Sequence, residues 1–375
     1  MYKVEVLDMR QVIIKASELN KNIDFVPTVV FGFYCETDRG TFLKTAEKIK
    51  ECFGDIIVIA CSSSGNVFAK VPYRTNETVL CLMNLDADAV SLYFSNDKDE
   101  VRTPPNDNNV KRDALLFYAG GGSWIQEGLQ SLQEQLFGGT FFGAVTGTLN
   151  TQKSGSLYYD GKFYEEGVLG CLIDTAKYEL KGSALHDFEP AGIELLITEA
   201  EGNTIIQIED EPALSMIERI IGTITPKRMA MYDTPFFIKN SMSNQKFECS
   251  LMSLQSIDRT TETLSLSHDI QVGSILKVAI PISNKTMQRR LLKMKNSVLP
   301  RDKKGAAMFF LSSSSLPSHW HEMEVLYMMK IINQVDIPFM GLHTFGEIAP
   351  LANHNHSILR DQTLTVVSIS KRSTV

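Results

Sequence analysis

The chain has 375 residues, of which 44 are acidic and 37 are basic, and its formal net charge is −7. At about 150 residues per domain this length favours two or three domains. The shares of hydrophobic (43%) and charged (22%) residues are those of an ordinary globular protein. The acidic balance argues against a protein of nucleic acids or anionic membranes, which would need a basic field.

The first ten residues carry no apolar signal core, and the chain has no uninterrupted apolar run of about 18 residues. None of the six cysteines forms a CxxC pair, and most stand in apolar surroundings. We therefore expect a cytoplasmic protein whose cysteines are buried, reduced thiols.

Three stretches repeat one plan, in which an apolar strand precedes a helix with an apolar stripe and a second apolar strand follows. Their elements are residues 28–34, 41–53 and 55–61; residues 114–119, 127–137 and 140–145; and residues 306–311, 320–335 and 337–342. This order predicts βαβ crossovers with parallel strand pairs. Each unit ends in a small, Gly-containing turn, at 61–65, 143–147 and 341–346, which indicates a weak internal repeat.

Between the units the pattern predicts antiparallel structure. Hairpins are expected at Asp160-Gly161 and Glu201-Gly202. A short helix is expected to start with Asp210 as its N-cap and Pro212 in its first turn, and to end at Gly222. The polar stretch 223–245 favours a domain boundary. Further strands are expected at 248–257, 263–266, 275–280 and 363–369.

The segment Gly341–Pro350 (GLHTFGEIAP) resembles the C-terminal signature of the FIST family, the F-box and intracellular signal transduction sensor domains. Thr363–Val366 after Asp361-Gln362 is similar to that family's closing motif, and Cys61–Val67 is similar to an early one. Departures from the pattern are Asn66, His343, Ala349, Asp361 and the serines Ser312–Ser315, where the family often has Glu, an aromatic residue, Gly, Asn and a nearby Cys.

The resemblance implies an α/β protein of the mixed α+β kind, with two domains, helix-covered mixed sheets and a possible αββα layering. It divides the chain into a FIST N-like domain (1–222), a boundary segment (223–245) and a FIST C-like domain (246–375). It also implies a non-catalytic sensor that binds a small molecule such as an amino acid or a small carboxylate. Its signal would pass to a partner such as a histidine kinase or a cyclase.

The turns between strand and helix are one group of candidate ligand-binding residues. Gly120, Gly121, Gly122 and Ser123 follow a predicted strand and precede a predicted helix, where backbone N–H groups attract anions. Ser312 and Ser313 occupy the equivalent turn of the third unit. The alternatives are a tight glycine turn and a helix-capping serine run without a ligand.

The turns after the second strands are the other group of candidates. Ser62, Ser63 and Gly65 form one such turn, and His343, Thr344, Gly346 and Glu347 form the other. In open α/β sheets ligands lie beyond the carboxyl ends of the strands. Hydroxyls and a carboxylate there would hold an amino group, while N–H groups would hold a carboxylate. The alternative is that these residues only shape the turn.

Five of the seven histidines fall between His319 and His356, which suggests a metal site or, by the family resemblance, a haem-linked nitric-oxide sensor. Exposed loop histidines are the alternative. His186 is an interdomain alternative for haem ligation, although no haem ligand of the family can be assigned to a residue of this sequence. The basic run Lys285–Lys304 keeps a helical apolar stripe. It is either a solvated helix face or a surface that docks an acidic partner, as in a protein-binding adaptor.

Overall fold

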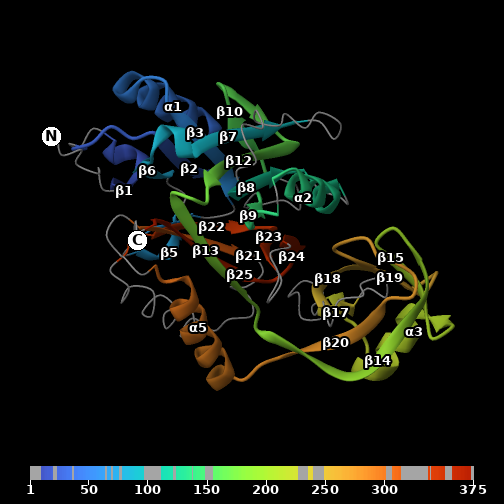
Figure 1. Ribbon diagram of the computed structural model, residues 1–375. Coiled ribbons are helices and arrows are strands. Elements are labelled where there is room, and N and C mark those ends of the chain that lie inside the picture. Colours follow the sequence, from blue (N-terminus) through green and yellow to red (C-terminus); the bar gives the residue numbers. More distant parts are fainter. Residues whose placement is uncertain are drawn as a thin grey trace.

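The structure is a computed structural model that describes most of the chain. The described residues are 10–19, 23–35, 38–63, 66–68, 71–75, 78–96, 111–120, 124–136, 138–147, 155–226, 235–239, 249–300, 306–313, 337, 339–350 and 357–372. Their strands form four sheets. Three sheets share one core and make up the body (residues 10–187 and 282–372), and the fourth makes up the barrel (residues 188–281), which has its own core (Figure 1).

The three sheets of the body have the same strand plan. The first contains, in spatial order, β1 (Arg10–Lys15), β6 (Val79–Asn84), β2 (Val29–Cys35), β3 (Ile57–Ser63), β10 (Leu157–Tyr159) and β11 (Lys162–Tyr164). The second contains β7 (Val90–Ser95), β12 (Gly167–Asp174), β8 (Arg112–Ala119), β9 (Phe141–Val145), β23 (Gly346–Pro350) and β24 (Ser357–Arg360). The third contains β13 (Tyr178–Leu185), β25 (Leu364–Lys371), β21 (Ala307–Ser313), β22 (Phe339–Thr344), β4 (Asn66–Phe68) and β5 (Val71–Thr75).

In each sheet the third and fourth strands are parallel, and every other described neighbouring pair is antiparallel. These parallel pairs are β2–β3, β8–β9 and β21–β22, so the three predicted βαβ strand pairs are confirmed. After the second strand of each pair the chain crosses to another sheet: β3 leads to β4, β9 to β10 and β22 to β23. The internal repeat of the sequence is therefore a cyclic, threefold repeat of topology.

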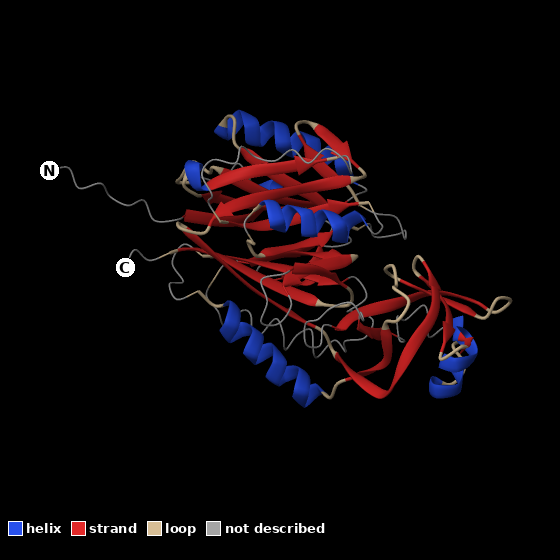
Figure 2. Ribbon diagram, turned by 45° about the vertical axis from the view of Figure 1, so that its right-hand side comes forward, coloured by secondary structure: helices blue, strands red, loops and turns tan. Residues whose placement is uncertain are grey.

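Side chains alternate between the shared core and an outer helix, as expected for strands buried on both faces. On β2, Val29, Phe31 and Phe33 face the shared core, whereas Val30 and Tyr34 pack toward α1 (Arg39–Phe53). In the same way α2 (Trp124–Gln135) covers the second sheet and α5 (Asn284–Val298) covers the third. Figure 2 shows these helices on the outside of the stacked strands.

The predicted α+β class with mixed, helix-covered sheets is confirmed. The possible αββα layering is extended, because three sheets rather than two enclose the common core. The third predicted helix, at 320–335, lies outside the described residues. No helix in the described part of the chain is long and apolar enough to cross a bilayer. The described part of the body also contains two short 3₁₀ helices, η1 (Ala16–Glu18) and η3 (Ala87–Ala89).

The barrel is a ring of antiparallel strands. In order it contains β14 (Phe188–Glu201), β20 (Ile275–Pro281), β17 (Pro235–Lys239), β18 (Cys249–Asp258), β19 (Thr263–Leu266), β15 (Thr204–Ile208) and β16 (Glu211–Pro212). The ring closes because the long strand β14 pairs with both β20 and β15. Helix α3 (Ala213–Ile221) adds Leu214 and Ile217 to the barrel core.

The start of α3 differs from the prediction. Pro212 is itself the N-cap, and Asp210 lies in the preceding turn with φ 62°. The hairpin turn after β15 takes up the two residues that the sequence pattern assigned to the cap. The predicted end is confirmed, since Gly222 follows the last turn with φ 77°, a conformation that glycine adopts without strain.

Two adjacent chain segments connect the body to the barrel, and we call them the neck. One runs from β13 through His186 and Asp187 into β14, and the other runs from β20 through Ile282 into α5. The Ile282 N–H donates to the Asp187 carbonyl (2.7 Å), which ties the two segments together. Arg290 of α5 donates to the carbonyls of His186 (3.2 Å) and Phe188 (3.1 Å).

In the structure the chain is therefore divided at the neck, into the body on one side and the barrel on the other. Described residues of the predicted boundary segment 223–245, such as Ile224 and Phe236, belong to the barrel core. The division into FIST N-like and FIST C-like domains at 223–245 stays a prediction about sequence modules.

Candidate functional site

Glu347 is a fully buried carboxyl at the corner where the chain leaves the third sheet for the second. It is the second residue of β23, and its exposed fraction is 0%. The Thr344 hydroxyl donates to Glu347 Oε1. The Thr363 hydroxyl (2.6 Å) and N–H (3.1 Å) donate to Oε2. Glu347 thus fixes the corner and the segment that leads into β25.

Burial raises the pKa of Glu347 to about 8, even though the hydrogen bonds from Thr344 and Thr363 act to lower it. The negative charge of nearby Asp361 adds to the increase. At neutral pH a carboxyl group with this pKa is protonated in most of the protein molecules. It exchanges that proton with little free-energy cost near pH 8.

The segment fixed by Glu347 contacts the barrel directly. Asp361 Oδ1 lies 3.2 Å from His268 Nε2, and Asp361 Oδ2 accepts the Ser253 N–H at 3.2 Å. Gln362 Nε2 donates to Ser253 Oγ at 2.8 Å. Ser267 Oγ also accepts from the Ser253 N–H at 3.2 Å. We call these five residues the clasp, because Asp361 and Gln362 belong to the body and the others to the barrel.

The clasp is electrostatically biased toward an ion pair. Burial alone would raise the pKa of Asp361, but His268 and the hydrogen bonds hold it below its usual range. Burial alone would lower the pKa of His268, but Asp361 raises it above its usual value. The His268 side chain keeps 26% of its surface exposed, so it is the part of the clasp that solvent reaches.

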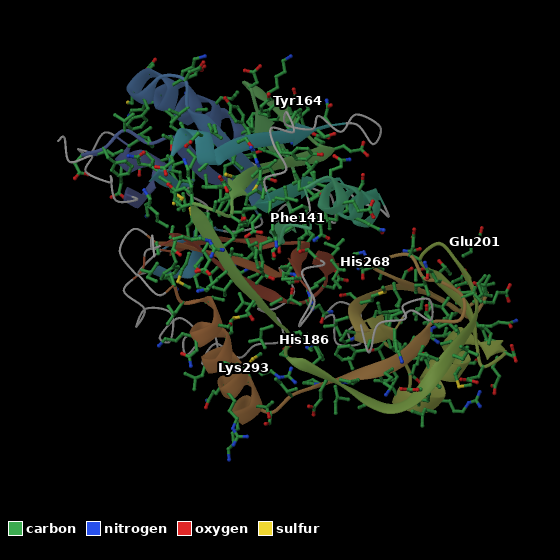
Figure 3. All side chains as sticks on the ribbon, viewed as in Figure 1. Phe141, Tyr164, His186, Glu201, His268 and Lys293 are labelled. Atoms are coloured by element: carbon green, nitrogen blue, oxygen red, sulfur yellow. The ribbon has the colours of Figure 1, made fainter. Side chains whose placement is uncertain are left out.

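Gln362 is held in a left-handed backbone conformation, with φ 48°, although it is neither glycine nor exposed. Such strain costs about 1–3 kcal/mol and persists only where the surroundings impose it. Here the hydrogen bonds of Asp361 on one side and Thr363 on the other impose it. Figure 3 shows His268 at the side of the barrel that faces the body, and His186 at the neck.

Five of the predicted ligand-binding residues meet around this corner. Ser312 and Ser313 end β21 and lie opposite His343 and Thr344 on the parallel strand β22. The Ser313 N–H donates to the Thr363 carbonyl at 3.0 Å, and Gly346 opens β23 beside them. The prediction that Ser312, Ser313, His343 and Thr344 lie in turns is wrong, because they are the last residues of β21 and β22. They are buried, and their polar groups lie at one end of the third sheet.

Ser62 belongs to a neighbouring corner of the threefold repeat. Its Oγ donates to the Gly147 carbonyl (3.2 Å) and accepts the Ser156 N–H (2.8 Å). Gly147 in turn packs closely against Phe345. A Cβ at position 147 would come within 2.0 Å of the Phe345 ring. The Ser62 corner and the Glu347 corner are therefore neighbours. Ser63 follows Ser62 at the buried end of β3.

Comparison with known proteins identifies the family through the N-terminal part of the chain. The family model of the FIST N domain matches residues 28–211. The chain belongs to the FIST family. A search of curated proteins found no match. FIST domains are signal-transduction sensors, so the expected family and its sensory role are confirmed at this level, whereas the FIST C-like assignment of 246–375 stays a prediction.

Part of the FIST resemblance acquires a physical meaning in the structure. Glu347 and Thr344 come from the Gly341–Pro350 signature, and Thr363 comes from the closing motif. Hydrogen bonds join these two motifs. The resemblance quoted Asp361, Gln362 and Thr363 but did not make them site residues. Ser253, Ser267 and His268 carried no sequence signal, because only the fold places the barrel against the body.

Several predictions fall outside the described residues. They concern Gly65, Gly121, Gly122 and Ser123, together with the four clustered histidines at 319, 321, 354 and 356. Gly120 is described and takes φ 95° directly after β8, which fits the predicted glycine turn. The anion-binding proposal for this turn stays a prediction.

In the part of the chain that the structure describes, no group of three His, Cys, Asp or Glu side chains is arranged to hold a metal ion. Of the described histidines, His186 was the candidate for haem ligation. Its Nδ1 accepts the Phe188 N–H at 3.4 Å, and its ring packs edge-on against Phe237. This arrangement does not fit an axial haem ligand, since the remaining nitrogen then carries the proton of the neutral ring.

Proposed function

We propose that the protein is a cytoplasmic sensor in intracellular signal transduction that binds a small ligand, an amino acid or a small carboxylate, at the junction of body and barrel. The observation that carries this proposal is the clasp. Two segments that resemble FIST motifs, Gly341–Pro350 and Thr363–Val366, converge on Glu347, and the segment that Glu347 fixes contacts the barrel through Asp361. A ligand that binds at the clasp therefore acts on the position of the barrel.

The chemistry of the clasp suits a zwitterionic or anionic ligand. The His268 imidazole, partly exposed and biased toward the charged form, can receive a carboxylate. Asp361 is a carboxylate with oxygens for an ammonium group, and Ser253 and Ser267 add hydroxyls. An amino acid supplies both charges and can exchange with the His268–Asp361 pair, which offsets the cost of separating the two side chains.

Sensing requires that the ligand favour one arrangement of the barrel over another, because equal affinity for both shifts no equilibrium. The neck permits such a change. It consists of two neighbouring segments with the Arg290 hydrogen bonds as its main described support, whereas the clasp is the second attachment of the barrel. In this proposal the partner that reads the barrel position is a signalling protein such as a histidine kinase or a cyclase.

A thermal-shift screen of ligand-free protein against the common amino acids and small carboxylates tests the proposal. A ligand at 100 times its dissociation constant should stabilise the protein by about 2.7 kcal/mol. Asp361→Asn should abolish that stabilisation, whereas Asp160→Asn, on an exposed hairpin tip far along the chain, should preserve it.

Two outcomes would contradict the proposal in different ways. Silence of the wild-type protein across the set would reject an amino acid or small carboxylate as the ligand. Equal stabilisation of the wild-type and Asp361→Asn proteins would keep a ligand of this class but place it away from the clasp.

A further inference from the structure

Helix α5 carries a basic stripe on its outer face. Lys285, Arg289 and Lys293 are exposed and lie four residues apart, so they follow one line along the helix. Over eight residues this line spans roughly 12 Å. Residues 282–300 contain no Asp or Glu, although the chain as a whole has net charge −7. Figure 3 shows Lys293 pointing away from the body.

Packing does not explain the stripe. The helix is held on the third sheet by its other face, where Met287, Leu291 and Met294 are buried. Arg290 has a structural role at the neck, whereas Lys285, Arg289 and Lys293 have no ion-pair partner among the described residues.

Helix stability does not explain the stripe either. Like charges four residues apart destabilise a helix by about 0.2–0.5 kcal/mol per pair. Lys285 also lies in the first turn, where the helix dipole disfavours a cation, and that turn has no acidic residue. The arrangement costs stability in the isolated protein, and that cost is recovered when anionic groups cover the stripe.

We propose that the outer face of α5 is a docking surface for an acidic protein partner. The partner segment that binds there is an acidic helix or loop. Its carboxylates lie opposite Lys285, Arg289 and Lys293, and an apolar site on it contacts Leu292. Leu292 is 45% exposed and stands beside the stripe, so the surface combines charge with an apolar anchor. A long polyanion such as a nucleic acid would extend beyond the stripe and be repelled by the overall negative charge of the protein. An acidic segment as short as the stripe contacts only its basic residues.

Charge reversal with a matched control tests this surface. The probe is a labelled helical peptide of about 16 residues, some 24 Å long, with Glu at every fourth position and Leu beside that line. The test variant is Lys285→Glu/Arg289→Glu/Lys293→Glu, which leaves Arg290 unchanged. The control is Lys44→Glu/Lys50→Glu/Lys162→Glu, at three exposed sites away from α5, which changes the net charge by the same amount.

At low salt the peptide should bind the wild-type protein, and binding should weaken as salt shortens the screening length from roughly 30 Å at 0.01 M to 10 Å at 0.1 M. The α5 variant should lose at least tenfold in affinity, and the control less than twofold. Leu292→Gln should weaken binding at all salt concentrations. Vesicles containing phosphatidylserine should leave the wild-type protein in solution.

Equal losses in the α5 variant and the control would overturn the proposal, because the effect would then belong to the net charge. Failure of the wild-type protein to bind the peptide at low salt would also overturn it. Vesicle binding that is lost in the α5 variant alone would replace the protein partner with a lipid surface. None of these outcomes depends on the ligand proposed for the clasp, so the two proposals fail separately.

Discussion

Glu347 gives the protein a specific dependence of stability on pH. Its pKa is about 8 in the folded protein, against a usual value near 4.5. Above pH 4.5 the unfolded chain releases this proton, but the folded protein retains it up to about pH 8. The group therefore contributes stability that is fully present below pH 4.5 and is lost as the pH rises through 8. Between pH 5 and pH 8 the loss is about 3.5 kcal/mol, at 1.36 kcal/mol per unit of pKa difference, because the group is still half protonated at pH 8.

Glu347→Gln removes this dependence while keeping the shape of the side chain and an oxygen that accepts from Thr344 or Thr363. At pH 5 the variant should be equal to the wild-type protein or less stable by about 1 kcal/mol, because one hydrogen bond is altered. At pH 8 it should be more stable than the wild-type protein by about 3 kcal/mol, since no charge is then buried.

The measurement is urea unfolding, followed by circular dichroism at several values between pH 5 and pH 8, for both proteins. The difference between their unfolding free energies isolates Glu347, because the other titrating groups contribute equally to each. A difference that stays constant across this range would refute the reasoning. It would mean that the donors from Thr344 and Thr363 stabilise the carboxylate enough to cancel its burial.

Three further predictions concern packing, the neck and the clasp. Gly147→Ala should destabilise the protein by about 1–3 kcal/mol in urea unfolding, because the new Cβ would clash with the Phe345 ring. Gly128→Ala, in α2, should stabilise the protein by about 0.5–1 kcal/mol, because the space around Gly128 is open and alanine favours a helix. Equal effects would contradict the close approach at the corner. Burial lowers the pKa of His186 to about 4, so the wild-type protein should lose up to about 3 kcal/mol as the pH falls from 6.5 through 4, and His186→Gln should lose less. Asp361→Asn should loosen the barrel and increase the radius of gyration in small-angle X-ray scattering; an unchanged radius would show that the neck alone sets its position.

The elements of the body were predictable because each βαβ unit carries its own signal. Helix α1 begins two residues before the predicted 41–53. In the barrel, Thr263–Leu266 is also a strand as expected. The closure of the barrel was not predictable. It depends on β14, whose register shifts near Ala191 and Ile197 let one long strand bend and pair on both sides. Such bends arise from tertiary packing and leave little trace in a period-two pattern.

The residues of the candidate site that belong to the body were predictable from the sequence, whereas those that belong to the barrel were not. Thr344, Glu347 and Ser313 stand at the ends of apolar strands, where a polar residue is conspicuous in the sequence. His268 lies after the short strand β19 of the barrel, and nothing near it in the sequence distinguishes it from a surface histidine. Only the juxtaposition with Asp361, 93 positions further along the chain, raises the pKa of His268 and makes it part of the clasp.

The threefold repeat produces three equivalent corners, and one of them carries an ionisable side chain. Strand register places Asn66 opposite Leu342, Glu347 opposite Ala144 and Leu157 opposite Cys61, and these three partners face the shared core from the fourth strand of each sheet. Asn66, Leu157 and Glu347 therefore hold corresponding places, and of the three only Glu347 can ionise. The barrel contacts the body beside this corner, through the segment that Glu347 fixes. A symmetric scaffold supplies three corners, and the carboxyl group at one of them holds the segment that contacts the barrel.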